Sequence, residues 1–345
     1  MRFIHMADVH LGAVPDSPCP WSAFRENEIW ETFVRVIDQI REEKIELLLI
    51  AGDLFHRQPL PSQTERVSQL FASIPDTEVV WMAGSHDYLR EDSAYRKVKW
   101  TKNVHGFLSE KPEVISLEKL HTKVYGCSYE HPEVTEAIYS SIRPEDQPGI
   151  HILLAYGGDE THIPMKKEDG AGFDYVALGH IHRPQKMGRE TLRYSGTPLK
   201  YSFSEADHKK SVTIVELLEK GNVRVSTEPL IPRRDMRKLR GTYMDVTAKD
   251  HYTAENKMDY LQITLTDEED VPGALQKLRT VYPNLMRLEY DNKRTRENRE
   301  VQAVEAQEQK SELELFQEFY ELQNNQSMTE VQEQFVEELL RGMKE

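Results

Sequence analysis

The sequence predicts an α/β fold with parallel strands, and two observations support this prediction. Five apolar runs, the first of them short, each precede glycine, acidic, histidine or tyrosine residues. Residues 47–51 are aliphatic throughout, as in strands buried on both faces. Between the first two runs, apolar residues recur at helical spacing, namely Trp30, Phe33, Val34, Ile37 and Ile40. A strand-helix-strand crossover of this kind places its two strands parallel.

Candidate ligands follow each of the five runs. The runs 3–4, 47–51, 79–83, 150–155 and 173–178 precede, in order, Asp8-x-His10, Gly52-Asp53, Gly84-Ser85-His86-Asp87, Tyr156-Gly157-Gly158 and Gly179-His180-x-His182. Parallel sheets bind ligands outside the carboxyl ends of their strands. A polar turn explains any single motif as well as a ligand does, but turns alone do not select His, Asp and Gly so consistently. The set therefore favours a site for manganese, iron or zinc, to which imidazoles offer neutral nitrogen donors.

Composition indicates the compartment. The 345 residues carry a net charge of -15 and 38% hydrophobic residues, enough for one large catalytic domain and smaller parts. No apolar run approaches the ~20 residues of a membrane span. The N-terminus shows no basic, apolar, cleavable signal. Two cysteines, Cys19 and Cys127, cannot form a disulfide framework, so we expect a cytoplasmic protein without membrane contact.

A smaller α+β domain is predicted for residues 231–292. Strand-like alternation occurs at 243–246, 260–265 and 286–290, and Pro272 opens a helix with Leu275 and Leu278 on one face. Basic clusters lie at the start of this domain and directly after it, and they are the best candidates for contact with DNA phosphates. They include Arg233, Arg234, Arg237, Lys293 and Arg294. Solvated linkers are the alternative interpretation of such basic runs.

The C-terminal part is predicted to be a charged linker, 293–310, followed by two short amphipathic helices in residues 311–345. Ser327 and Glu330 have the spacing of a capping box at the start of the second helix. Two helices this short cannot bury their apolar faces against each other alone, so they lie either on the catalytic domain or on a partner. The candidate partner-binding residues are Leu315, Phe316, Phe319, Tyr320, Phe335 and Leu339.

The strand-end motifs resemble those of the calcineurin-like metallophosphoesterases. In addition, the stretch 194–205, YSGTPLKYSFSE, resembles the SbcD branch of DNA repair nucleases within that superfamily. The resemblance implies a β-sandwich flanked by helices for residues 1–230 and a capping domain that feeds DNA into the nuclease site for residues 231–292. It also implies that the helical tail docks on the coiled-coil base of an SMC-like ATPase, SbcC.

The resemblance further implies a centre of two metal ions, usually Mn²⁺, with Mg²⁺, Fe²⁺ or Zn²⁺ as other candidates. The first ion would be held by Asp8, His10, Asp53 and His182, with Asp53 bridging to a second ion that His180, Ser85 and Tyr156 would hold. The family usually has asparagine in place of Ser85 and histidine in place of Tyr156. A serine hydroxyl is a poorer donor, and a tyrosine must lose a proton with a pKa of about 10 before it binds metal well. We therefore expect one tight ion and a second ion that is weak or absent.

By the same resemblance, His86 would contact the phosphate and assist the leaving group, and Asp87 would orient His86. Two cations about 3.5 to 4 Å apart can activate water, neutralise the non-bridging oxygens and steady the leaving oxygen of a phosphodiester. The sequence thus predicts a manganese-dependent DNA exo- or endonuclease of reduced activity, a homodimeric subunit of an SbcCD-like complex for double-strand-break repair. The alternative is a catalytically impaired DNA-binding or scaffolding subunit of the same fold. A small-molecule phosphodiesterase is disfavoured, because a cap and a partner-binding tail would be superfluous.

Overall fold

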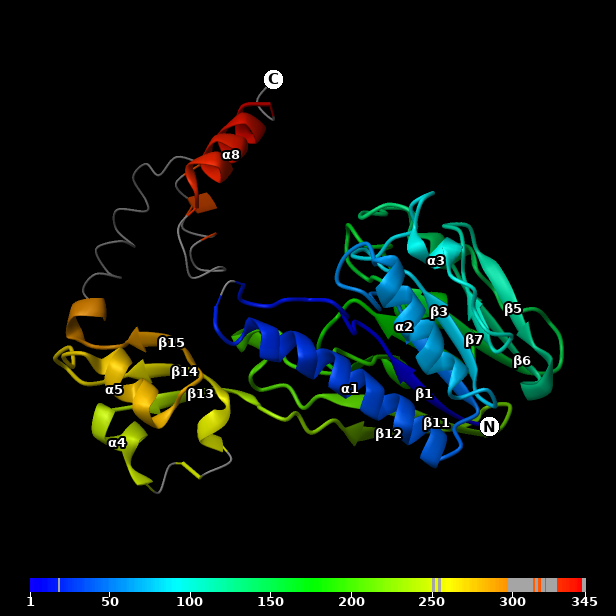
Figure 1. Ribbon diagram of the computed structural model, residues 1–345. Helices are drawn as coiled ribbons and strands as arrows, with labels where there is room; N and C mark the ends of the chain where they lie inside the picture. Colours follow the sequence, from blue (N-terminus) through cyan, green and yellow to red (C-terminus); the bar gives the residue numbers. More distant parts are fainter. Residues whose placement is uncertain are drawn as a thin grey trace. The chain divides into compact units, whose positions relative to one another are not determined.

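The computed structural model divides the chain into two compact units, Met1–Met236 and Arg237–Glu345 (Figure 1). The residues that the structure describes are 1–17, 19–249, 252–253, 256–296, 313, 316–317, 320 and 328–342. We keep the finer predicted division, with boundaries after residues 230, 292 and 310, as a proposal.

The first unit begins with a six-stranded sheet in the order β12-β11-β1-β2-β3-β4. Its strands are β1 (Arg2–Met6), β2 (Leu47–Ala51), β3 (Glu78–Met82), β4 (Val104–Gly106), β11 (Ser211–Glu219) and β12 (Asn222–Pro229). Strands β1 to β4 are parallel neighbours, whereas β11 is antiparallel to both β1 and β12. The predicted parallel arrangement of the first two strands is therefore confirmed.

Helices cover one face of this sheet (Figure 1). They are α1 (Ser22–Glu42), α2 (Pro61–Ala72) and the short α3 (Ala94–Lys97). Helix α1 is the predicted crossover between β1 and β2, and its buried stripe contains Phe33, Ile37 and Ile40. Val36 completes this stripe, while the predicted Val34 is only partly buried. Burying each such side chain contributes roughly 1.5–3 kcal/mol to the free energy of folding. Apolar residues at helical spacing are therefore a reliable sign of a helix packed on the sheet.

A second six-stranded sheet has the order β5-β6-β7-β8-β10-β9. Its strands are β5 (Glu113–Leu117), β6 (Thr122–Gly126), β7 (Ile150–Tyr156), β8 (Tyr175–Gly179), β9 (Gln185–Met187) and β10 (Arg189–Tyr194). Apolar side chains of the two sheets share one core, with Phe3, Leu49 and Val80 from the first sheet and Ile152 and Tyr175 from the second. The fold is thus the expected β-sandwich flanked by helices.

The five predicted strands are divided between the two sheets, and glycines allow these sheets to approach closely at the strand ends. Strands β1, β2 and β3 belong to the first sheet, and β7 and β8 to the second. A Cβ atom at Gly179 would lie 1.7 Å from the carbonyl oxygen of Ala51. At Gly52, which has a φ of +79°, a Cβ atom would lie 2.1 Å from the ring of Tyr156. Since only glycine fits at either point, the strand ends of both sheets can face one site.

Short 3₁₀ turns interrupt the loops of both units. They are η1 (Glu118–Leu120), η2 (Ile138–Ser141), η3 (Lys167–Gly170), η4 (Phe203–Glu205) and η6 (Asn256–Met258).

The second unit contains a three-stranded sheet in the order β13-β14-β15. Its elements are β13 (Met236–Gly241), α4 (Tyr243–Thr247), β14 (Tyr260–Leu265), α5 (Ala274–Val281) and β15 (Leu285–Tyr290). Strands β14 and β15 are parallel, with α5 between them in the chain. Leu261, Ile263, Leu278 and Tyr282 form its core. The strands predicted at 260–265 and 286–290 are confirmed.

Two details of this unit correct the prediction. Residues 243–246 lie in helix α4 and are not a strand, because Thr242 and Asp245 bond to each other's backbone amide and start a helix at this point. The strand lies earlier, at β13, which contains Arg237 of the predicted basic cluster. Helix α5 begins after Gly273, and only Leu278 of the predicted pair is buried, since Leu275 is exposed.

The described part of the tail consists mainly of helix α8 (Glu330–Gly342). It begins where Thr329 and Gln332 bond to each other's backbone amide. The predicted cap Ser327 lies outside the described residues. Among the predicted partner-binding residues, Phe316, Phe335 and Leu339 are 40%, 62% and 51% exposed. Tyr320 is partly buried, and Leu315 and Phe319 lie outside the described residues. Within the described ranges, no helix has the length and apolar character needed to cross a membrane.

Candidate metal centre

The loops after β1, β2 and β8 hold candidate ligands in strained backbone conformations. Asp8, His10, Asp53 and His180 have φ values of 51°, 50°, 48° and 97°. A residue other than glycine in such a conformation costs of order 1–3 kcal/mol and persists only where its surroundings enforce it. Backbone bonds provide this support: the Asp8 amide donates to the Gly52 carbonyl at 3.1 Å, and the His10 amide to the Asp53 carbonyl at 3.0 Å. Strain at four neighbouring polar residues indicates a functional site.

The residues predicted for the first metal ion lie together. One donor atom each from Asp8, His10 and His182 falls within 4.8 Å of the other two. The His10 Nε2 atom lies 3.8 Å from Asp53 Oδ2. This nitrogen is buried and finds no hydrogen-bond partner among the described residues. A buried ring nitrogen that lies beside two carboxylates without a hydrogen bond is suited to bind a cation, so the donor set fits a divalent metal.

The electrostatics of these side chains also favour a cation. Burial raises the pKa of Asp8 to about 7, although His182 and the His180 amide oppose this effect. Burial, together with the neighbouring carboxylates of Asp87 and Asp8, raises the pKa of Asp53 well above its usual value. Burial lowers the pKa of His10, which keeps its imidazole neutral. A divalent cation would relieve the repulsion between the carboxylates and accept a neutral imidazole.

Tyr156 lies among the residues predicted for the second ion. Its hydroxyl donates to Asp53 Oδ2 at 2.7 Å and lies 3.0 Å from Ser85 Oγ and 3.3 Å from His180 Nδ1. Burial and the negative charges of Asp53 and Asp8 raise the pKa of this phenol well above 10. The phenol therefore stays protonated. The predicted second set is brought together, but its members are joined by hydrogen bonds through the tyrosine oxygen.

His180 contacts two residues that were not singled out in the sequence. Its Nε2 atom lies 2.6 Å from Asp159 Oδ2, and the same carboxylate lies 2.9 Å from His162 Nδ1. The only signal in the sequence was the spacing Asp159-x-x-His162 shortly after β7.

The stretch 194–205 contacts the Nδ1 side of the His182 ring through Glu205. Glu205 Oε1 lies 3.1 Å from His182 Nδ1, and Glu205 Oε2 accepts from Lys210 Nζ at 2.5 Å and from the Thr197 hydroxyl at 3.2 Å. Burial alone would raise the pKa of Glu205, but its bonds to His182 and Lys210 lower this pKa to about 2. Ionised Glu205 therefore binds the Nδ1 side of the ring and leaves Nε2 for the site. Neither Glu205 nor Lys210 was among the predicted site residues.

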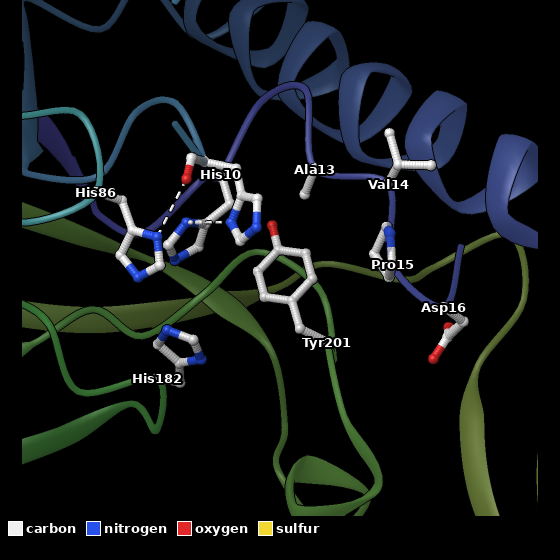
Figure 2. Close-up of a pocket in the computed structure, with 9 residues that line it drawn as sticks. His10, Ala13, Val14, Pro15, Asp16, His86, His182 and Tyr201 are labelled. Atoms are coloured by element: carbon white, nitrogen blue, oxygen red, sulfur yellow. Dashed lines mark hydrogen bonds between the residues drawn. The ribbon is translucent and has the colours of Figure 1, made fainter. Parts of the chain in front are cut away.

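A pocket of about 280 Å³ opens beside the metal set. It is lined by His10, His56, His86, His182 and Tyr201, together with the loop from Ala13 to Asp16. Figure 2 shows His10, His86 and His182 around this pocket, with the Tyr201 ring beside His10. His56 is a further residue that the prediction missed as a site residue, although it lies close after the Gly52-Asp53 motif, behind Leu54 and Phe55.

The expected role of Asp87 needs correction. Asp87 is fully buried and accepts hydrogen bonds from the amides of Phe55 and Gly84 and from the Tyr95 hydroxyl at 2.5 Å. His86 Nδ1 instead pairs with the His56 carbonyl at 3.1 Å. Asp87 therefore fixes the loop that carries His86, and no hydrogen bond between the two side chains is found in the described part of the chain.

The predicted DNA-contact residues are largely engaged with carboxylates. The pairs are Arg233 with Glu31, Arg234 with Glu28, Arg237 with Asp259 and Arg294 with Asp270. Arg233 and Arg234 belong to the first unit, and Arg237, Lys293 and Arg294 to the second. Because a partner carboxylate competes with phosphate, we expect the more exposed Arg233 and Arg294 to be freer for DNA than Arg234 and Arg237.

Comparison with known proteins gives similarities to two family models, to a curated protein and to a solved structure. A family model described as calcineurin-like phosphoesterase matches residues 1–184. A model named SbcD_C, described as the Type 5 capsule protein repressor C-terminal domain, matches residues 232–324. The chain is 24% identical over 390 residues to a nuclease subunit of SbcCD from Staphylococcus epidermidis, covering 99% of this chain and 98% of that protein. The crystal structure of TT1561 of Thermus thermophilus covers 66% of this chain and 98% of its own, with 11% identity and a TM-score of 0.37, too low to support an inference.

Proposed function

Since the chain belongs to the calcineurin-like phosphoesterase family, we propose that it is a metal-dependent DNA nuclease, the nuclease subunit of an SbcCD-like repair complex. The observation that carries this proposal is the donor set of buried Asp8, His10 and Asp53 with the partly exposed His182, in which His10 Nε2 has no hydrogen-bond partner among the described residues. The end-to-end similarity to a protein named as an SbcCD nuclease subunit supports it.

We propose that these four residues hold Mn²⁺, with Mg²⁺, Fe²⁺ or Zn²⁺ as alternatives. A mixed set of two carboxylates and two imidazoles suits Mn²⁺, Fe²⁺ and Zn²⁺ better than Mg²⁺, which prefers oxygen ligands. When bound, the ion would supply Lewis-acid polarisation of the phosphodiester. The protein's own residues then have separate tasks. Glu205 keeps the His182 ring in place, and the half-exposed His86 faces the pocket from a loop that Asp87 anchors, where it can contact the phosphate.

The hydrogen bond from the Tyr156 hydroxyl to Asp53 supports the binding of one tight ion rather than two. A neutral phenol that donates to Asp53 uses one of the lone pairs with which that carboxylate would bridge two metals. The same observation favours the second candidate function, a DNA-binding or scaffolding subunit whose turnover is negligible. Both proposals share the fold and the first metal set, so only an activity measurement separates them.

We propose DNA, an SbcC-like ATPase and a second copy of the chain as partners. The exposed apolar side chains Phe316, Phe335 and Leu339 of the tail are candidates for contact with the ATPase. The similarity of residues 232–324 to the SbcD_C model supports a DNA-handling or partner-handling role for that region.

The decisive experiment is a manganese-dependent DNA cleavage assay on the chain, on Asp53→Ala and on the double variant Ser85→Asn with Tyr156→His. We expect slow cleavage by the unaltered chain and none by Asp53→Ala. The double variant should be faster by on the order of a hundredfold, the effect of one good electrostatic contact to the transition state. If neither the chain nor the double variant cleaves DNA with any metal, the scaffolding proposal is the correct one.

A further inference from the structure

A second group of metal-binding side chains lies on the other side of Tyr156. Asp159, His162 and His180 each offer one donor atom, and these atoms lie within 4.8 Å of one another. The rings of His162 and His180 are tilted with their centroids 4.3 Å apart. Both histidines contact the same carboxylate, at 2.9 Å and 2.6 Å. Two imidazoles that converge on one carboxylate have the composition of a transition-metal site.

The Tyr156 phenol separates this group from the first metal set. Its oxygen lies between Asp53 Oδ2 and His180 Nδ1, so the Nδ1 side of His180 faces the phenol. The Nε2 side faces Asp159 instead. A cation bound through Nε2 would therefore be held by Asp159 and His162 and would not share Asp53.

The donors indicate which cation this group would take. Mg²⁺ and Ca²⁺ prefer oxygen ligands, whereas imidazole nitrogen suits zinc and its neighbours, and such sites bind zinc more tightly than manganese. The side chains of Asp159, His162 and His180 are 47%, 22% and 21% exposed, so an ion can reach them from solvent. Three protein ligands also leave a coordination position for water.

We propose that Asp159, His162 and His180 form a zinc site that is separate from the set of Asp8, His10, Asp53 and His182. In this chain, His180 serves the separate site through Nε2, while its Nδ1 side faces the Tyr156 oxygen. The site does not require the chain to be a nuclease, because its evidence is the donor geometry alone. The competing explanation is that Asp159 and His162 only orient His180 by hydrogen bonds.

Zinc stoichiometry of the tag-free, full-length chain tests the proposal, measured by calorimetry with a competing chelator and by elemental analysis. We expect two zinc ions on the unaltered chain. His162→Gln and Asp159→Asn should each retain one ion, bound by the first set. Asp8→Asn should also retain one ion, bound by the separate site. His131→Gln is the matched control, since His131 also pairs with a carboxylate, Glu110 at 3.1 Å, and should leave both ions bound.

Two results would overturn the site. One is a single zinc ion on the unaltered chain that Asp8→Asn removes. The other is a His162→Gln variant that binds two zinc ions as tightly as the unaltered chain. Thermal unfolding in the presence of chelator shows whether each variant is folded, and His162 and Asp159 provide independent substitutions. Since the readout is metal content, a negative cleavage assay leaves this test unaffected.

Discussion

Replacing Glu205 by glutamine tests whether a residue outside the metal set controls metal affinity. Glu205 binds His182 Nδ1 at 3.1 Å and Lys210 Nζ at 2.5 Å, and the side chains of Glu205 and Lys210 are buried. The negative charge favours a proton on Nδ1 and thereby directs the unprotonated Nε2 toward the metal set. Glutamine keeps the shape and one hydrogen bond but removes this charge.

The expected losses of metal affinity and of stability follow from the bonds of Glu205 to His182 and to Lys210. Removing a partner that orients a metal-binding histidine typically weakens metal affinity about 10- to 100-fold, or ~1.4–2.8 kcal/mol. The substitution also leaves Lys210 buried beside a neutral amide. Breaking a buried ion pair lowers the free energy of unfolding by up to about 3–5 kcal/mol. The glutamine oxygen can still accept a hydrogen bond from Lys210, so we expect a smaller loss than this.

Manganese titration by calorimetry measures the first effect, and thermal unfolding in chelator measures the second. Glu190→Gln is the matched control, because Glu190 pairs with Lys186 at 2.6 Å on the surface and should change neither quantity. If Glu205→Gln unfolds at a lower temperature but binds manganese with unchanged affinity, Glu205 stabilises the fold without orienting His182, and our reasoning about the site is refuted.

Three further predictions concern stoichiometry, the tail and the loop that carries His86. In manganese alone, the chain should bind about one tight ion, since Tyr156 donates to Asp53. The double variant Ser85→Asn with Tyr156→His should bind a second ion. Anomalous scattering that shows two equally tight ions in the unaltered chain would contradict this prediction. Removing residues 311–345 should leave the first unit folded, because the described strands of its sheets all lie before residue 230, and should abolish co-purification with an SbcC-like ATPase. Phe316→Glu with Phe319→Glu should act like the truncation, since burying a carboxylate in an apolar groove costs several kcal/mol, and retained binding would disprove the docking role. Tyr95→Phe should lower the unfolding free energy by about 1–3 kcal/mol in chemical denaturation, because the buried Asp87 loses a hydrogen bond, and an unchanged midpoint would show that water replaces it.

Much of the first unit could be predicted from the sequence because its signals are local. Continuous aliphatic runs such as 47–51 predicted strands, and the stripe around Phe33 and Ile37 predicted the crossover helix. The apposition of two sheets is not local: it depends on close approach at Gly52 and Gly179, and the family resemblance rather than periodicity implied it. The strand predicted at 243–246 was wrong because the capping pair Thr242 and Asp245 outweighed the alternation of side chains.

The candidate site shows the same limit. Residues at strand ends, such as Asp8 and Asp53, could be found from sequence, since each follows an apolar run within four residues. The roles of Asp159, His162 and Glu205 could not be predicted, because these residues reach the site only through contact with His180 or His182. The role expected for Asp87 failed for the same reason: adjacency in the chain suggested contact with His86, whereas its carboxylate turns inward to Tyr95.

The metal set is divided between the two sheets, and this division links metal binding to the stability of the protein in the cell. Asp8, His10 and Asp53 follow strands of one sheet, and His182 follows a strand of the other. A bound ion would therefore act as a clasp between the two halves of the sandwich. An ion present at a hundred times its dissociation constant adds about 2.7 kcal/mol to folding stability. Metal supply would then govern how much of the chain escapes proteolysis as well as how much of it is active, and a metal-starved cell would lose the protein itself.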